Sequence, residues 1–154
     1  MPEIKYMERA LQLAIEAAEA GEVPVGCVIV KDSEIISEGR NMREERQNAL
    51  HHAEIEAIDK ACKALGDRRL EGCELYVTLE PCPMCAGAIF NARIDTVVFG
   101  AFDSNMGACG GVINIFEEAF GFKPKLYGGF MKEECAAVLK DFFIKLTIIN
   151  LYNI

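Results

Sequence analysis

The sequence predicts an α/β sandwich whose sheet is partly parallel, and two patterns support that prediction. Segments with helical periodicity alternate along the chain with short apolar segments typical of strands. One of these, residues 25–30, is apolar almost throughout, as expected of a strand covered on both faces. The chain has 154 residues, 51% of them hydrophobic, which is enough to bury a substantial core. We therefore predict a single domain over residues 1–154.

The first part of the chain predicts a helix followed by a hairpin. Apolar residues recur at helical spacing over residues 4–18, and Gly21 is a suitable end for that helix. Residues 25–30 and 35–39 are predicted to form two strands joined by a short polar turn. Residues 40–51 are polar and are predicted to form a loop.

A second helix is predicted to begin near His52 and to end at Gly66. Part of its apolar face is expected to consist of Ile55, Ile58, Cys62 and Leu65. The solvated face is expected to carry Glu56, Asp59, Lys60 and Lys63. Glu54 is in phase with Ile58, Ala61 and Leu65, which places a carboxylate on the interior side.

The second half is predicted to continue the alternation of strands and helices. Strands are predicted over residues 75–79, 96–101 and 125–127, and helices over residues 82–92 and from Cys135 to Leu146. Residues 103–111 form a glycine-rich loop, and one or two helical turns are predicted within residues 116–120. The apolar segment 147–154 matches neither pattern well enough for assignment.

Charge and cysteine content restrict the function. The formal net charge of −8 argues against broad, sequence-independent nucleic-acid binding, which depends on lysine and arginine. The seven cysteines are odd in number and show no disulfide framework, which favours a reducing cytoplasm. No signal peptide is apparent, and no apolar run approaches the roughly 20 residues of a membrane-spanning helix.

Cys82 and Cys85 are the first candidate metal ligands. Residues three apart lie on the same face of a helix, and Pro83 suits the first turn of one. A helix N-terminus favours thiolate over thiol, and thiolate is the form that binds metal. A Cys-x-x-Cys pair alone also fits a structural zinc site or a redox dithiol.

His52 supplies a third ligand, and a three-ligand zinc site leaves a fourth position for water, whose pKa zinc lowers to about 7. His51 is a poor fourth ligand, because adjacent helical residues point about 100° apart. Cys109 is the other candidate for that position. Glu54, beside the metal on an interior face, suits general acid/base work, although an isolated carboxylate there also fits a salt bridge.

The combination His52-Ala53-Glu54 and Pro81-Cys82-Pro83-Met84-Cys85 matches the established signature of zinc-dependent nucleobase deaminases. The chain resembles the cytidine deaminase superfamily, and within it the bacterial tRNA adenosine deaminases that convert the wobble adenosine to inosine. The similar segments span most of the chain and are residues 22–26, 39–41, 52–54, 69–72, 75–88, 97–101 and 141–143.

The resemblance implies a three-layer α/β/α sandwich with a five-stranded mixed sheet. It also implies a homodimer with one Zn²⁺ per subunit, no organic cofactor and a tRNA anticodon stem-loop as substrate. His52, Cys82 and Cys85 would bind the metal, and Glu54 would transfer protons. In the substrate site, Asn41 would hydrogen-bond the flipped base, Ala53 would contact the substrate and Asp103 would touch the RNA backbone.

Two segments depart from the family pattern, and both lie where RNA would be held. Residues 48–51 replace the usual lead into His-Ala-Glu, and the final helix continues into apolar residues instead of lysine and arginine. Two alternatives therefore stay open. One is a deaminase of a free base or nucleoside, such as guanine, cytosine or cytidine, and the other is a non-catalytic zinc-binding protein.

Overall fold

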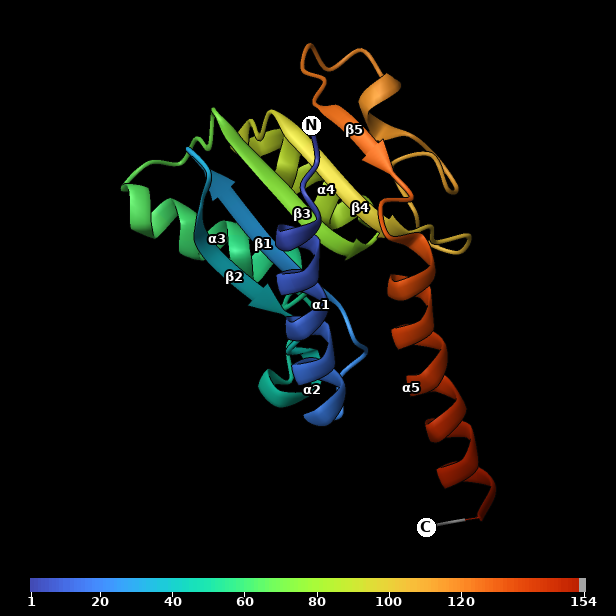
Figure 1. The fold of residues 1–154 in the computed structure, drawn as a ribbon. Coiled ribbons are helices and arrows are strands. Elements are labelled where there is room, and N and C mark those ends of the chain that lie inside the picture. The colour runs from blue at the N-terminus through green and yellow to red at the C-terminus, as the bar shows by residue number, and fades with distance from the viewer. Residues whose placement is uncertain (153–154) are drawn as a thin grey trace.

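The computed structural model describes residues 1–152, and its five strands form one mixed sheet with helices on both faces (Figure 1). The elements are α1 (Ile4–Glu19), β1 (Gly26–Lys31), β2 (Glu34–Arg40), α2 (Arg43–Arg46), α3 (Ala53–Leu65), β3 (Cys73–Leu79), α4 (Pro83–Ala92), β4 (Thr96–Ala101), the 3₁₀ turn η1 (Ile115–Glu117), β5 (Lys125–Gly128) and α5 (Lys132–Tyr152). The predicted three-layer α/β/α sandwich is confirmed.

The strand order is β2-β1-β3-β4-β5. β1 pairs antiparallel with both β2 and β3, whereas β3, β4 and β5 run parallel to one another. The parallel part follows from the connections, because α4 carries the chain from the end of β3 back to the start of β4. The sheet is therefore mixed, as predicted.

Side chains of the central strands alternate between two cores. On one face, Cys27 and Ile29 of β1 pack with α3 and α4, and on the other, Val28 and Val30 pack with α1 and the start of α5. Figure 1 shows α1 in front of the sheet and α3 and α4 behind it. Burial on both faces explains why residues 25–30 are apolar without alternation.

The sequence prediction of α3 was correct for Glu54, which is buried, but only partly correct for the apolar face. The helix packs on the sheet through Ala53, Ala57 and Ala61, because Gly39 of β2 lets its backbone approach closely. A Cβ atom on Gly39 would lie only 2.3 Å from the carbonyl oxygen of Ala53. Of the predicted face, Ile58 and Cys62 are partly buried and pack against the core, Ile55 is half-buried, and Leu65 is exposed.

Glu56 corrects a second expectation, because it is buried rather than solvated. Its carboxylate is paired with the ring of His51 and lies 3.8 Å from the guanidinium of Arg46. His51, predicted to be a poor metal ligand, is therefore a structural partner of Glu56. The segment 40–51 is also not wholly a loop, since residues 43–46 form the short helix α2.

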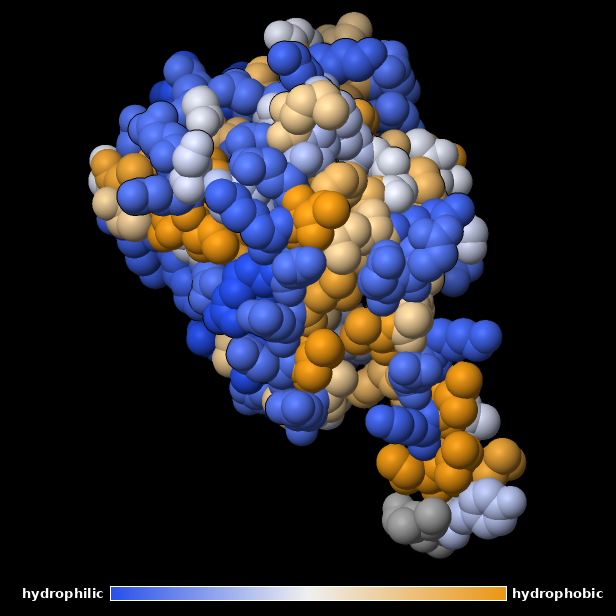
Figure 2. Space-filling view, in the orientation of Figure 1, coloured by the Kyte–Doolittle hydropathy of each residue, from blue (hydrophilic) through white to orange (hydrophobic). Residues whose placement is uncertain are grey.

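α5 includes most of the C-terminal segment that the sequence left unassigned, and residues 153–154 lie outside the described range. Its end projects beyond the sheet, and apolar side chains, orange in Figure 2, gather on the face in view. The exposed apolar residues there are Phe143, Ile144, Leu146, Ile148, Ile149, Leu151 and Tyr152. Among residues 1–152, no helix is long and apolar enough to span a membrane.

Candidate active site

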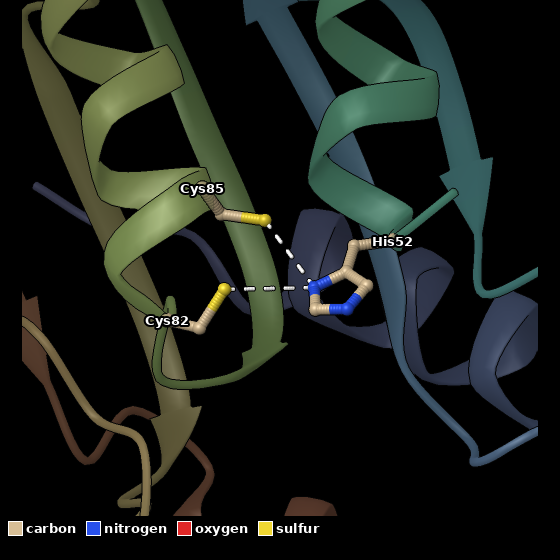
Figure 3. Close-up of side chains that lie close together, drawn as sticks. All are labelled: His52, Cys82 and Cys85. Carbon is tan, nitrogen blue, oxygen red and sulfur yellow. Dashed lines mark hydrogen bonds between the residues drawn. The ribbon is translucent and has the colours of Figure 1, made fainter. Parts of the chain in front are cut away.

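His52, Cys82 and Cys85 come together between the beginnings of α3 and α4 (Figure 3). The Nδ1 atom of His52 lies 3.6 Å from the sulfur of Cys82 and 3.5 Å from the sulfur of Cys85. The three donor atoms lie within 4.8 Å of one another. Within residues 1–152, Cys109 is not part of this group, so the structure assembles a set of three donors and not four.

The spacing of these donors fits a tetrahedral zinc ion. With Zn–S near 2.3 Å and Zn–N near 2.0–2.1 Å, tetrahedral geometry places a nitrogen and a sulfur ligand about 3.6 Å apart. Both measured nitrogen–sulfur distances lie close to this value. The donor chemistry also suits zinc, because imidazole and thiolate are its usual protein ligands. The residues therefore fit the ion, with one coordination position not supplied by these side chains.

The local backbone explains how the ligands converge. His52 and Cys82 are each the residue that immediately precedes a helix, and both have extended backbone. His52 thus lies outside the helix, so its ring and the Glu54 side chain can face the same point. Pro83 occupies the first turn of α4, and Cys85 follows within that turn.

The two thiols hold protons unequally. A hydrogen bond from Cys85 lowers the pKa of Cys82 to about 4, and the neighbouring His52 ring also favours its thiolate. The same bond, together with burial, raises the pKa of Cys85 well above its usual value. The pair thus supplies one ready thiolate, and metal binding displaces the remaining thiol proton.

Glu54 lies two residues after His52 and is only 4% exposed. Burial raises the pKa of Glu54 to about 7, because the charged form loses its hydration. The adjacent imidazole of His52 acts in the opposite direction and the Cys82 sulfur in the same one. A carboxyl group with this pKa both accepts and donates protons near neutral pH, which is what general acid/base catalysis requires.

The donor group opens into a cavity of about 350 Å³, within the size range of small-molecule sites. Glu54 and two of the three metal-binding candidates line it. The lining residues are Val23, Val25, Asn41, Arg43, Ala49, His52, Ala53, Glu54, Leu79, Glu80, Cys82, Asp103 and Met106. Cys85 is buried behind this surface. All seven predicted site residues except Cys85 therefore lie on the cavity wall.

Asn41 presents an unused acceptor at the cavity. Its Nδ2 donates to the carbonyl of Val23 at 3.2 Å, while its Oδ1 is buried and has no hydrogen-bond partner among residues 1–152. Buried polar atoms are nearly always paired, so an orphaned acceptor marks the position of a missing donor. Asn41 thus has the geometry of a ligand-binding side chain.

Asp103 and Ala53 contribute differently. Oδ1 of Asp103 accepts backbone N–H bonds from Asn105 at 2.9 Å and from Met106 at 3.1 Å, so part of this carboxylate stabilises its own loop. Ala53 is fully buried in the first turn of α3, between His52 and Glu54, where its small side chain leaves room in the cavity.

Glu80 and Met106 line the cavity but were not predicted from the sequence as site residues. Glu80 carried a usable signal, since a carboxylate directly follows an apolar strand where solvent is not expected. Arg43 and Met106 reach the cavity only because α2 and the loop after β4 fold over it. No local pattern indicates that arrangement.

The fold and this site define a zinc-dependent deaminase domain. Residues 2–101 match the model of the cytidine and deoxycytidylate deaminase zinc-binding region, so the chain belongs to that family. It is 50% identical to the tRNA-specific adenosine deaminase of Bacillus subtilis over 142 residues, which cover 92% of this chain and 88% of the relative.

Solved structures give the same assignment of fold. A structure from a study of A-to-I editing by tRNA:A34 deaminases superposes with a TM-score of 0.86 at 42% identity, over 89% of this chain and 100% of that one. A guanine deaminase from Bacillus subtilis superposes with a TM-score of 0.64 at 45% identity, over 68% of each chain. The predicted membership of the deaminase superfamily is confirmed.

Proposed function

We propose that this protein is a zinc-dependent hydrolase that converts the wobble adenosine of a tRNA anticodon loop to inosine. The observation that carries the proposal is the buried carboxyl of Glu54 beside a three-donor His-Cys-Cys group in one cavity. The similarity to tRNA-specific adenosine deaminases over most of both chains supports the substrate.

His52, Cys82 and Cys85 would hold the zinc ion, which when bound supplies a Lewis acid that lowers the pKa of water to about 7. The Glu54 carboxylate takes a proton from the attacking water and delivers it to the departing nitrogen. At C6 of adenine, the bond to the water oxygen forms, the bond to the amino nitrogen breaks, and ammonia leaves. The apolar walls, which include Val25 and Leu79, limit access of other water.

Asn41 would orient the base. Its free Oδ1 requires a donor, and adenine carries N–H donors on its exocyclic amino group. Because Glu54 is buried in the cavity wall, a base in a helical stack cannot reach it. The base must swing out, which is least costly in a loop where it is already partly unstacked.

Contacts with RNA phosphates are expected to be few. Arg43 lines the cavity, whereas Arg40 lies 2.9 Å from Glu45 and Arg46 lies near Glu56. Arg69, in the segment after α3, is paired with Glu71 and lines a different cavity. Arg43 is thus the arginine that lines the cavity. Asp103, at the opposite wall, would face the ribose–phosphate chain.

We expect the purified protein to form inosine in a tRNA anticodon stem-loop and to release no ammonia from free adenine. One or two phosphate contacts predict that log kcat/KM falls with log salt with a slope of only about −1 to −2. The Arg43→Ala variant should weaken this dependence by about one unit, and Arg69→Ala should leave it unchanged. Equal slopes for the parent and Arg43→Ala would remove Arg43 from the RNA contact.

A second candidate function is deamination of free guanine, favoured by the similarity to a guanine deaminase over two thirds of this chain. The two functions separate in one assay that measures inosine in the stem-loop alongside ammonia from guanine, cytosine and cytidine. Ammonia from a free base, with no inosine in the RNA, would establish the second function and refute the first.

Three further properties are part of the proposal. The family resemblance supports one zinc per subunit and a homodimer, which metal analysis and light scattering test. A cytoplasmic location is supported by seven free cysteines, which suit a reducing compartment. A single domain over residues 1–154 is supported by the one continuous sheet.

A further inference from the structure

Two buried carboxylates that have no role in the proposed proton transfer accept hydrogen bonds from the backbone of two segments of the cavity wall. The first, Glu80, is 2% exposed and immediately precedes the Pro81–Cys82 pair. Its Oε1 accepts the backbone N–H of Asp103 at 3.0 Å, and its Oε2 accepts those of Cys109 at 3.0 Å and Gly111 at 2.7 Å. One side chain thus pairs three backbone donors of a single loop.

The loop is shaped closely around that carboxylate. A Cβ atom on Gly107 would lie 2.4 Å from the Glu80 carboxyl group, and one on Gly111 would lie 2.5 Å from its Oε1. The backbone N–H of Ala108 also donates to the carbonyl of Pro81 at 2.9 Å. The glycines at these positions allow the 103–111 loop to wrap around Glu80, and this places Asp103 and Met106 on the cavity wall.

Glu22 likewise pairs backbone donors in the opposite wall of the cavity, formed by residues 43–46. It is 1% exposed and lies after the end of α1. Its Oε1 accepts the N–H of Glu44 at 3.0 Å and its Oε2 accepts that of Glu45 at 2.7 Å. These are first-turn donors of α2, which have no partner within the helix, so Glu22 fixes the turn that carries Arg43.

We propose that Glu80 and Glu22 are positioning residues that independently fix the 103–111 wall and the 43–46 wall of the cavity. They act through Asp103 and Met106 on one side and Arg43 on the other, and so determine how tightly the substrate is held. The effect on substrate affinity rests on the proposed RNA deamination, whereas the effect on the loops does not.

Glutamine at either position tests this assignment because it keeps the shape and changes the donor pattern. In Glu80→Gln, an amide nitrogen replaces one oxygen, and a donor then faces a backbone N–H. Glu22→Gln introduces the same conflict at α2. Loss of one hydrogen bond to a charged group corresponds to a change of roughly 10- to 100-fold.

The experiment measures amide hydrogen exchange and stem-loop kinetics for the parent and both variants, each with its zinc content determined. In Glu80→Gln, exchange should accelerate about 10- to 100-fold at Cys109 and Gly111, with residues 43–46 unchanged. In Glu22→Gln, exchange should accelerate at Glu44 and Glu45, with the 103–111 loop unchanged. In both variants KM for the stem-loop should rise about 10-fold or more, and kcat should change far less.

Several results would overturn the proposal. Unchanged exchange at the paired amides, faster exchange across the whole sheet in both variants, or a fall in kcat with KM constant would each contradict it. If Glu80→Gln does not fold, Gly111→Ala displaces the loop from an intact Glu80 and should give the same local exchange pattern. If the parent forms no inosine but the exchange pattern is as expected, the RNA function fails and the positioning roles stand.

Discussion

Replacement of Glu54 by glutamine is expected to lower kcat about 10²- to 10⁴-fold while the bound zinc stays at the parental level. Glutamine has the same shape, but its amide neither takes a proton from water nor delivers one to the leaving nitrogen. Glu54 is not one of the three convergent donor groups, so its loss removes no metal ligand. Single-turnover rates with the stem-loop, measured beside metal analysis, separate the chemical step from metal loss.

Glu56→Gln is the matched control for this experiment. Glu56 is a buried carboxylate on the same helix and two residues further on, but it faces His51 and Arg46 and does not line the cavity. Its substitution is expected to lower thermal stability and to leave kcat close to the parental value. A Glu54→Gln variant that binds zinc and turns over at the parental rate would exclude Glu54 as the proton-transfer group.

Much of the fold was predictable because local signals and tertiary packing agree. The apolar runs of residues 25–30, 75–79 and 96–101 become strands that lie within two residues of the predicted bounds. Their apolar character results from burial on both faces, which is a property of the sheet as a whole. The start of α4 was also predictable from the sequence, because Pro83 can occupy only a few positions in a helix.

The errors fall where contacts between distant residues decide the structure. The first backbone donors of α2 are paired by Glu22, 22 and 23 residues away, and nothing in residues 40–51 reveals that partner. Glu56 was placed on the solvated face by helical phase alone, yet His51 and Arg46 cover it. The buried face of α3 consists mainly of alanines. They are buried because Gly39 on a neighbouring strand lets the helix backbone approach the sheet closely.

The residues of the site also divide into those that local sequence reveals and those that depend on contacts between distant segments. His52, Glu54, Cys82 and Cys85 are fixed by two short segments, each with its ligand at a helix start, so spacing was sufficient to find them. Glu80, Arg43 and Met106 depend on how two loops fold across the cavity. The chemistry was therefore visible in the sequence, whereas most of the surface that would select the substrate was not.

Replacement of Cys82 by alanine is expected to abolish zinc retention and, with it, deamination. Loss of an outer-shell partner of a metal ligand typically costs about 10- to 100-fold in affinity, and loss of a ligand itself should cost more. Cys82 is also the residue most ready to bind, because its pKa of about 4 keeps it as thiolate near neutral pH. Zinc content after dialysis is the direct measurement.

Thermal stability gives a second readout that does not depend on the substrate. A ligand that binds only the folded state raises stability in proportion to the logarithm of its concentration over Kd. A chelator should therefore lower the Tm of the parent and leave that of Cys82→Ala unchanged. Cys109→Ala is the matched control, since Cys109 is buried nearby but lies outside the three-donor group in residues 1–152. It should keep zinc and the chelator response, and loss of both would instead make Cys109 a fourth ligand and the site a structural one.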